Sequence, residues 1–188
     1  LATKQTPIDS NNFDVLCGLS IHEASHKKVG TNRIKFQATT NVSGAKLTYD
    51  IIAQIGEEIY VDHTASLNSP IHASYIKKAR EAYKGDPDKR NWDNPVESWL
   101  ATSVYGIPFP QDINQKTLKI LNHLFDLSTK LKETNEKLYH HYSVRQKMYL
   151  DCWEKVRYLV EKPQFPGSQQ KKSHAQISKQ FLDRTEFK

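Results

Sequence analysis

Residues 13–26 read FDVLCGLSIHEASH, and this stretch decides the architecture expected for the chain. Its apolar residues Val15 and Leu19 are spaced as on one face of a helix, and Gly30 stands where a left-handed residue can end that helix. The pattern therefore predicts a helix over residues 13–29 with one face turned towards the interior of the protein.

His22, Glu23 and His26 of this helix match the pattern H-E-x-x-H. Positions four apart on an α-helix differ by about 40° around the axis, so the two imidazoles project side by side and can bind one Zn²⁺. Glu23 points about 100° away from His22, where a carboxylate can take a proton from the attacking water and return it to the leaving amine. Two unpartnered imidazoles would be costly to bury, which favours metal binding over a purely structural role.

A catalytic zinc site needs a third protein ligand, and the segment QIGEEIYVD at residues 54–62 offers one. Isoleucines at helical spacing predict a helix over residues 46–64 with a stripe that faces the core. Glu58 falls on the side of this stripe and is the first choice of ligand, whereas Glu57 falls nearly opposite its centre. Asp62, one turn after Glu58, is placed to accept the second ring N–H of a histidine and to fix its tautomer.

Other interpretations of these residues stay open. Glu57 and Glu58 could be a solvated acidic pair, and His63 and His72 are alternative ligands, each near a helix end. Imidazole and carboxylate ligands also accept Mn²⁺, Fe²⁺ or Co²⁺, so the pattern favours one zinc ion per chain without fixing the native metal.

The rest of the chain favours a mainly α fold, classed as α+β because a small β element is expected near residues 31–43. Pro and Gly at the ends of apolar-periodic segments mark further helices, over residues 70–84 and 95–105. Two long helices are expected between residues 113 and 161, paired antiparallel.

These elements predict two units. Residues 1–110 would form the metal-binding domain, and residues 111–188 a basic helical hairpin with a tail, packed on that domain. The net charge of +6 falls entirely on the second unit, because the first holds equal numbers of basic and acidic residues. No recognised nucleic-acid motif accompanies this charge, so we interpret it as a solvated face and expect no nucleic-acid partner.

The composition of the 188 residues, 37% hydrophobic and 26% charged, suits a packed core and excludes low-complexity chains. No apolar stretch approaches the roughly 18 residues of a membrane span, so no membrane partner is expected. Cys17 and Cys152 are interpreted as free thiols, which favours a reducing, cytoplasmic compartment. The first residues lack a start Met and a signal sequence, which favours a piece of a longer protein.

The motif stretch, followed by EEIYVD at residues 57–62, resembles the predicted metallopeptidases of phages and bacteria that often precede a von Willebrand factor A-type domain. More broadly, it is similar to the gluzincins, the thermolysin-like group of zincins. The resemblance covers roughly residues 1–85 and implies a zincin-like helical core that binds zinc. It implies that His22, His26 and Glu58 are the zinc ligands. It also implies that Glu23 is the catalytic base and that Asp62 steadies a histidine.

The resemblance also leaves two functions to compare. The phage-type proteins tend to show Glu-Asp at the positions held here by Glu57 and Glu58, which keeps Glu57 as an alternative ligand. The favoured function is a zinc-dependent metallopeptidase acting on a peptide or protein substrate. The alternative is a non-catalytic, metal-stabilised interaction module of a larger phage or bacterial protein, whose long helices dock a partner subunit or a downstream domain.

Overall fold

A computed structural model describes residues 9–35, 45–110, 112–133 and 141–160 of this chain. Within these ranges the chain is mainly helical, as predicted, and forms no strand. The elements are α1 (Ser10–Val29), the 3-10 turn η1 (Thr31–Arg33), α2 (Tyr49–Asn68), α3 (Pro70–Tyr83), the 3-10 turn η2 (Pro87–Lys89), α4 (Pro95–Ser103), α5 (Gln115–Glu133) and α6 (Tyr142–Val160).

The small β element expected near residues 31–43 is not seen in the part of that range that the structure describes. Thr31–Arg33 form the 3-10 turn η1, and Ile34 after it is extended without belonging to a strand. Residues 36–44 lie outside the described residues. The weak alternation of apolar and polar residues predicts a strand here, whereas the segment begins as a tight 3-10 turn.

Capping residues set the helix boundaries. Gly30 ends α1 in the left-handed conformation, with φ of 72°, as predicted. The Ser69 hydroxyl accepts a hydrogen bond from the His72 N–H at the start of α3, and the Asn94 side-chain oxygen accepts one from the Val96 N–H at the start of α4. A proline follows each cap. These local signals placed α3 and α4 within one or two residues of their observed bounds.

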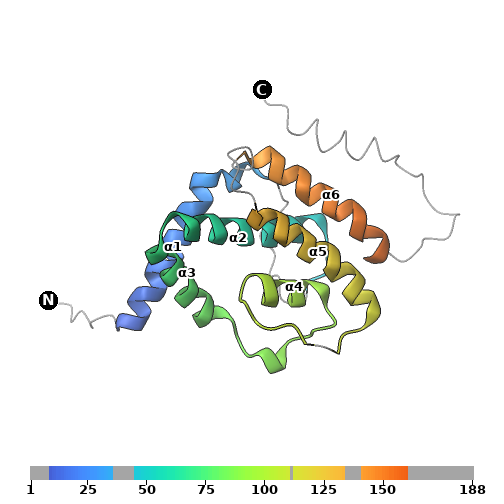
Figure 1. Ribbon diagram of the computed structural model, residues 1–188, viewed down its shortest axis with the longest axis horizontal. Helices are drawn as coiled ribbons and strands as arrows, with labels where there is room; N and C mark the ends of the chain where they lie inside the picture. Colours follow the sequence, from blue (N-terminus) through green and yellow to red (C-terminus); the bar gives the residue numbers. More distant parts are fainter. Residues whose placement is uncertain (1–8, 36–44, 111, 134–140, 161–188) are drawn as a thin grey trace, which may run out of the picture.

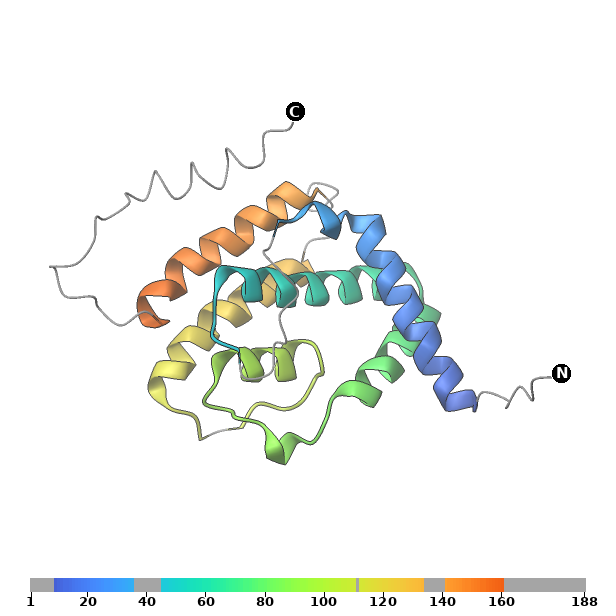
Figure 2. The ribbon, with the colours of Figure 1, turned by 180° about the vertical axis from the view of Figure 1, so that it is seen from behind.

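Helix α2 is the centre of the fold and contacts all five other helices. In Figures 1 and 2, α1 and α3 flank it on one side of the molecule and the α5–α6 pair flanks it on the other. Its isoleucines Ile52, Ile55 and Ile59 are at most 2% exposed. Burial on several sides leaves α2 without the single solvent face that an amphipathic surface helix has.

Two glycines allow helices to approach closely beside the predicted site. A Cβ on Gly18 of α1 would overlap the backbone of Tyr75 in α3. A Cβ on Gly56 of α2 would overlap the ring of Tyr149 in α6, so Gly56 permits close packing of these two helices. The first approach brings α3 against the histidines of α1, and the second brings α6 against the acidic pair of α2.

Helices α5 and α6 lie side by side and run antiparallel, as predicted (Figures 1 and 2). Side chains from both join the core around α2, among them Leu124 and Tyr149, so residues on either side of position 110 share one core. The division into two units stays a prediction. None of the described helices is long and apolar enough to cross a membrane.

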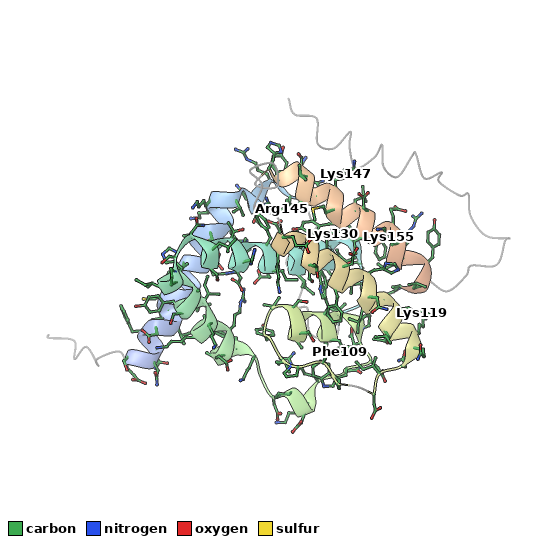
Figure 3. All side chains as sticks on the ribbon, viewed as in Figure 1. Phe109, Lys119, Lys130, Arg145, Lys147 and Lys155 are labelled. Carbon is green, nitrogen blue, oxygen red and sulfur yellow. The ribbon has the colours of Figure 1, made fainter. Side chains whose placement is uncertain are left out.

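The outer face of this hairpin carries exposed lysines, and whether it is only solvated or binds a partner stays a prediction. Lys119, Lys130, Lys147 and Lys155 are exposed on α5 and α6, whereas Arg145 is fully buried (Figure 3). Arg145 is thus the buried cation among the described residues of α5 and α6.

Candidate metal centre

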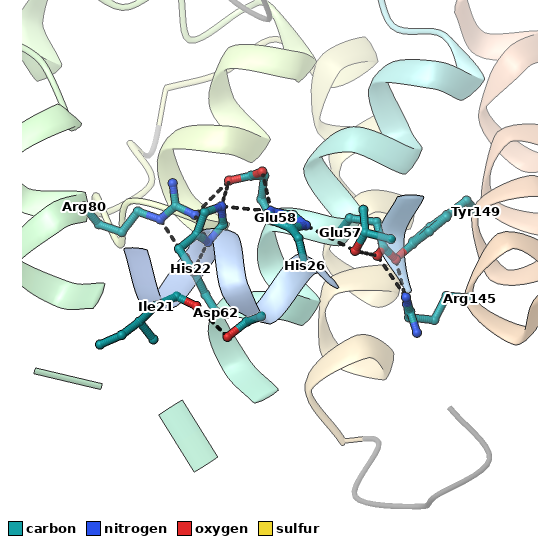
Figure 4. A network of polar contacts seen from close by, with 11 residues as sticks. Ile21, His22, His26, Glu57, Glu58, Asp62, Arg80, Arg145 and Tyr149 are labelled. Carbon is teal, nitrogen blue, oxygen red and sulfur yellow. Dashed lines mark hydrogen bonds and ion pairs between the residues drawn. The ribbon is translucent and has the colours of Figure 1, made fainter. Parts of the chain in front are cut away.

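His22 and His26 lie one turn apart on α1 and turn their rings towards each other. Their Nε2 atoms are 2.9 Å apart, and the rings meet edge to face. Glu58 of α2 lies against both rings: its Oε2 is 3.3 Å from Nε2 of His22, and its Oε1 is 3.3 Å from Nε2 of His26 (Figure 4). The structure therefore brings together the two histidines and the first-choice glutamate.

The three residues fit a divalent metal ion. Each offers one ligand atom, and these atoms all lie within 4.8 Å of one another. Two atoms bonded at about 2.0–2.1 Å to a tetrahedral zinc ion are about 3.3 Å apart. Each imidazole Nε2 lies at this distance from one of the two Glu58 oxygens, and the two Nε2 atoms, 2.9 Å apart, are somewhat closer together. Two histidines and a glutamate are also a ligand set used by catalytic zinc sites.

The second ring nitrogen of each histidine, Nδ1, also has a hydrogen-bond partner. Nδ1 of His22 is 2.8 Å from Oδ1 of Asp62 in α2, so of the two histidines that Asp62 could hold, it contacts His22. Nδ1 of His26 is 3.1 Å from the hydroxyl of Thr31, in the turn η1 that follows α1. Hydrogen bonds at these positions orient the rings and leave both Nε2 atoms directed at Glu58.

Arg80 of α3 completes the site and was missed by sequence reasoning. Its Nε donates to Oδ2 of Asp62 at 2.6 Å, and its Nη2 donates to Oε2 of Glu58 at 2.8 Å. One guanidinium thus bridges the two acidic side chains of α2 (Figure 4). The available signal was weak: Arg80 follows the buried Ile76 by one turn, so it had to lie on the buried face of α3.

Burial and charge act in opposite directions on these groups. Burial would lower the pKa of His22, but its hydrogen bonds to Asp62 and Glu58 outweigh burial and raise it to about 9. Burial would raise the pKa of Glu58, yet hydrogen bonds from both histidines lower it well below its usual range. Burial likewise opposes the charge of Arg80, whose pKa is raised by Asp62. Without a metal, two cations therefore balance the two carboxylates of Glu58 and Asp62.

Glu57 lies elsewhere, and the helical-phase interpretation of it was wrong. It was expected nearly opposite the core-facing stripe, but it is only 1% exposed, whereas the Glu58 side chain is 31% exposed. Its carboxylate accepts hydrogen bonds from Arg145 and Tyr149 of α6 and from Thr31, at 2.5 to 2.9 Å. The phase rule failed because α6 covers the side of α2 that was assumed to face water.

The remaining candidates are placed as follows. Glu23 is next to His22 on α1 and has an exposed side chain, so it meets solvent water. His63 is half-buried, and burial lowers its pKa. His72 lies in the first turn of α3. Neither of these two histidines belongs to the cluster of His22, His26 and Glu58 found among the described residues.

No protein-family model matches this chain, and neither a curated protein nor a solved structure does. The function of the site therefore has to be inferred from its own geometry and chemistry.

Proposed function

We propose that this protein is a zinc-dependent metallopeptidase that binds one zinc ion per chain through His22, His26 and Glu58. The observation that carries the proposal is the convergence of two imidazole Nε2 atoms and one carboxylate within 4.8 Å of one another. This grouping is formed by two helices, in a chain that also has a glutamate directly after the first histidine. The H-E-x-x-H pattern assigns that glutamate, Glu23, to proton transfer.

Each residue has a separate task in this proposal. When bound, a zinc ion polarises the scissile carbonyl and lowers the pKa of water. Glu23 acts as general base towards the attacking water and then delivers the proton to the leaving amine, so that the peptide bond breaks without expelling an amide anion. Asp62 holds the ring of His22, and Arg80 holds Asp62 and Glu58 in place. The substrate class is a peptide or protein.

The test compares Glu23→Gln with the wild type in zinc content and peptide hydrolysis. The amide keeps the size of the side chain but cannot accept the proton, so zinc content should be unchanged while hydrolysis falls by about a hundredfold to ten-thousandfold. Glu133→Gln is the matched control, because Glu133 is an exposed glutamate at the end of α5, outside the metal cluster. Hydrolysis that survives Glu23→Gln would remove the general-base role.

One observation favours the second candidate, a non-catalytic metal-stabilised interaction module. Zincins align an extended substrate along an edge strand, and residues 9–35 and 45–110 contain no strand that could do so. In that case the helices α5 and α6 would dock a partner subunit or a downstream domain. Zinc would then raise the melting temperature as much in Glu23→Gln as in the wild type, and neither would hydrolyse peptides.

A further inference from the structure

A second network starts at His26 and ends on α6. Nδ1 of His26 is 3.1 Å from Oγ1 of Thr31, and the same hydroxyl donates to Oε2 of Glu57 at 2.5 Å. Arg145 donates to both carboxylate oxygens of Glu57, at 2.6 and 2.9 Å, and the Tyr149 hydroxyl donates at 2.6 Å (Figure 4). These hydrogen bonds connect His26, a candidate metal ligand, to residues of α6 that are far from it in the sequence.

The donor and acceptor in each hydrogen bond of this network can be assigned by starting from the Glu57 carboxylate. The Glu57 carboxylate, paired with Arg145, can only accept hydrogen bonds. The single hydroxyl hydrogen of Thr31 is directed to Glu57, so the Thr31 oxygen can only accept from His26. Nδ1 of His26 must therefore carry a proton, so Nε2 is the nitrogen that a neutral His26 offers to a metal ion.

The network is also built into the core. Arg145 is fully buried and Glu57 is 1% exposed. The Arg145 guanidinium lies 4.3 Å from the ring centroid of Tyr60 and donates to the Val29 carbonyl at 2.9 Å. Since Val29 is the last residue of α1, Arg145 also fixes the end of the helix that carries His26.

A buried ion pair of this kind is weak evidence for stability, because desolvation of two charges offsets their attraction. Replacement by apolar side chains of similar volume is often neutral or stabilising in proteins. Stability alone therefore does not explain the buried pair of Glu57 and Arg145. The charge on Glu57 performs a task that an apolar residue could not perform: it orients the Thr31 hydroxyl.

We propose that Thr31, Glu57 and Arg145 are positioning residues of the metal centre, which hold His26 in the Nδ1–H tautomer and so make helix α6 part of the metal site. The inference rests on the proposed function only in taking His26 as a metal ligand. It assigns Glu57 a role as the outer support of a histidine, and it couples the C-terminal hairpin to metal affinity.

The test measures zinc affinity of the full chain by competition with a chelator. Thr31→Val keeps the shape of the side chain but removes the hydroxyl, and we expect it to weaken zinc binding about 10- to 100-fold. Thr31→Ser restores the hydroxyl and should restore the affinity. Thr117→Val is the matched control: Thr117 is 5% exposed, Thr31 is 8% exposed, and the Thr117 hydroxyl bonds the Asp93 carbonyl of a distant loop.

Nitrogen-15 NMR of the histidines in the metal-free protein gives a second, independent result. His26 should show a protonated Nδ1 in the wild type and in Thr31→Ser, and should lose this preference in Thr31→Val. If the wild type binds zinc and shows this tautomer but hydrolyses no peptide, the metallopeptidase proposal fails and the positioning role stands. If Thr31→Val binds zinc as tightly as the wild type, or no more weakly than Thr117→Val, the positioning role is wrong.

Discussion

The charge state of His22 leads to a prediction for the pH dependence of metal binding. His22 has a pKa of about 9 in the metal-free protein, so below that pH its Nε2 carries a proton where the metal would bind. Zinc must displace this proton, and the apparent affinity should rise about tenfold, or about 1.4 kcal/mol, for each pH unit below 9. From pH 6.5 to pH 8.5 the gain amounts to nearly two orders of magnitude.

Isothermal titration calorimetry in buffers of different ionisation enthalpy measures this proton directly. About one proton per zinc should be released from His22 at pH 7.5. In Asp62→Asn the carboxylate that raises the His22 pKa is gone, so fewer protons should be released. Asp126→Asn is the control, since Asp126 is an exposed aspartate on α5 that pairs with Lys130. A flat affinity from pH 6.5 to pH 8.5, without proton release, would refute this account of the site.

The same proton links folding stability to pH. The pKa of His22 is raised from 6.5 to about 9 on folding, so its stabilising contribution is fully present below pH 6.5 and is lost as the pH rises towards 9. The difference corresponds to at most about 3 kcal/mol in the free energy of unfolding. Urea unfolding of metal-free protein should show this decline, and Asp62→Asn should reduce it.

The remaining predictions concern the acidic pair of α2 and the contact between α1 and α3. Glu58→Gln should lower zinc affinity and cost less stability than Glu57→Gln, because the Glu58 side chain is 31% exposed and Arg80 keeps Asp62 as a partner. Glu57→Gln should cost about 3–5 kcal/mol of stability because Arg145 stays buried without its counter-ion. Equal zinc loss and equal stability in both variants would contradict their separate placement. Gly18→Ala should destabilise the fold by about 1–3 kcal/mol because its methyl group meets the α3 backbone, whereas Ser20→Ala, at an exposed position of α1, should not, as measured by urea unfolding; equal stabilities would contradict the close approach.

Much of the helical layout could be read from short stretches of sequence. The caps before Pro70 and Pro95 and the left-handed Gly30 act through bonds to residues within one turn, so their effect does not depend on the rest of the fold. The start of α2 was less predictable. The helix begins three residues later than expected because Thr48 caps it, with its hydroxyl accepting from the Ile51 N–H at 3.3 Å.

The sequence by itself determined that His22 and His26 share one face of a helix, since a spacing of four residues follows from the helical repeat alone. Only the tertiary structure decided which glutamate lies against these two histidines, and which arginine pairs with each glutamate. Glu58 meets Arg80 across 22 residues and Glu57 meets Arg145 across 88, and neither separation leaves a periodic signal. The physical reason is that α2 is enclosed by other helices, so the environment of each of its faces depends on which helix covers it.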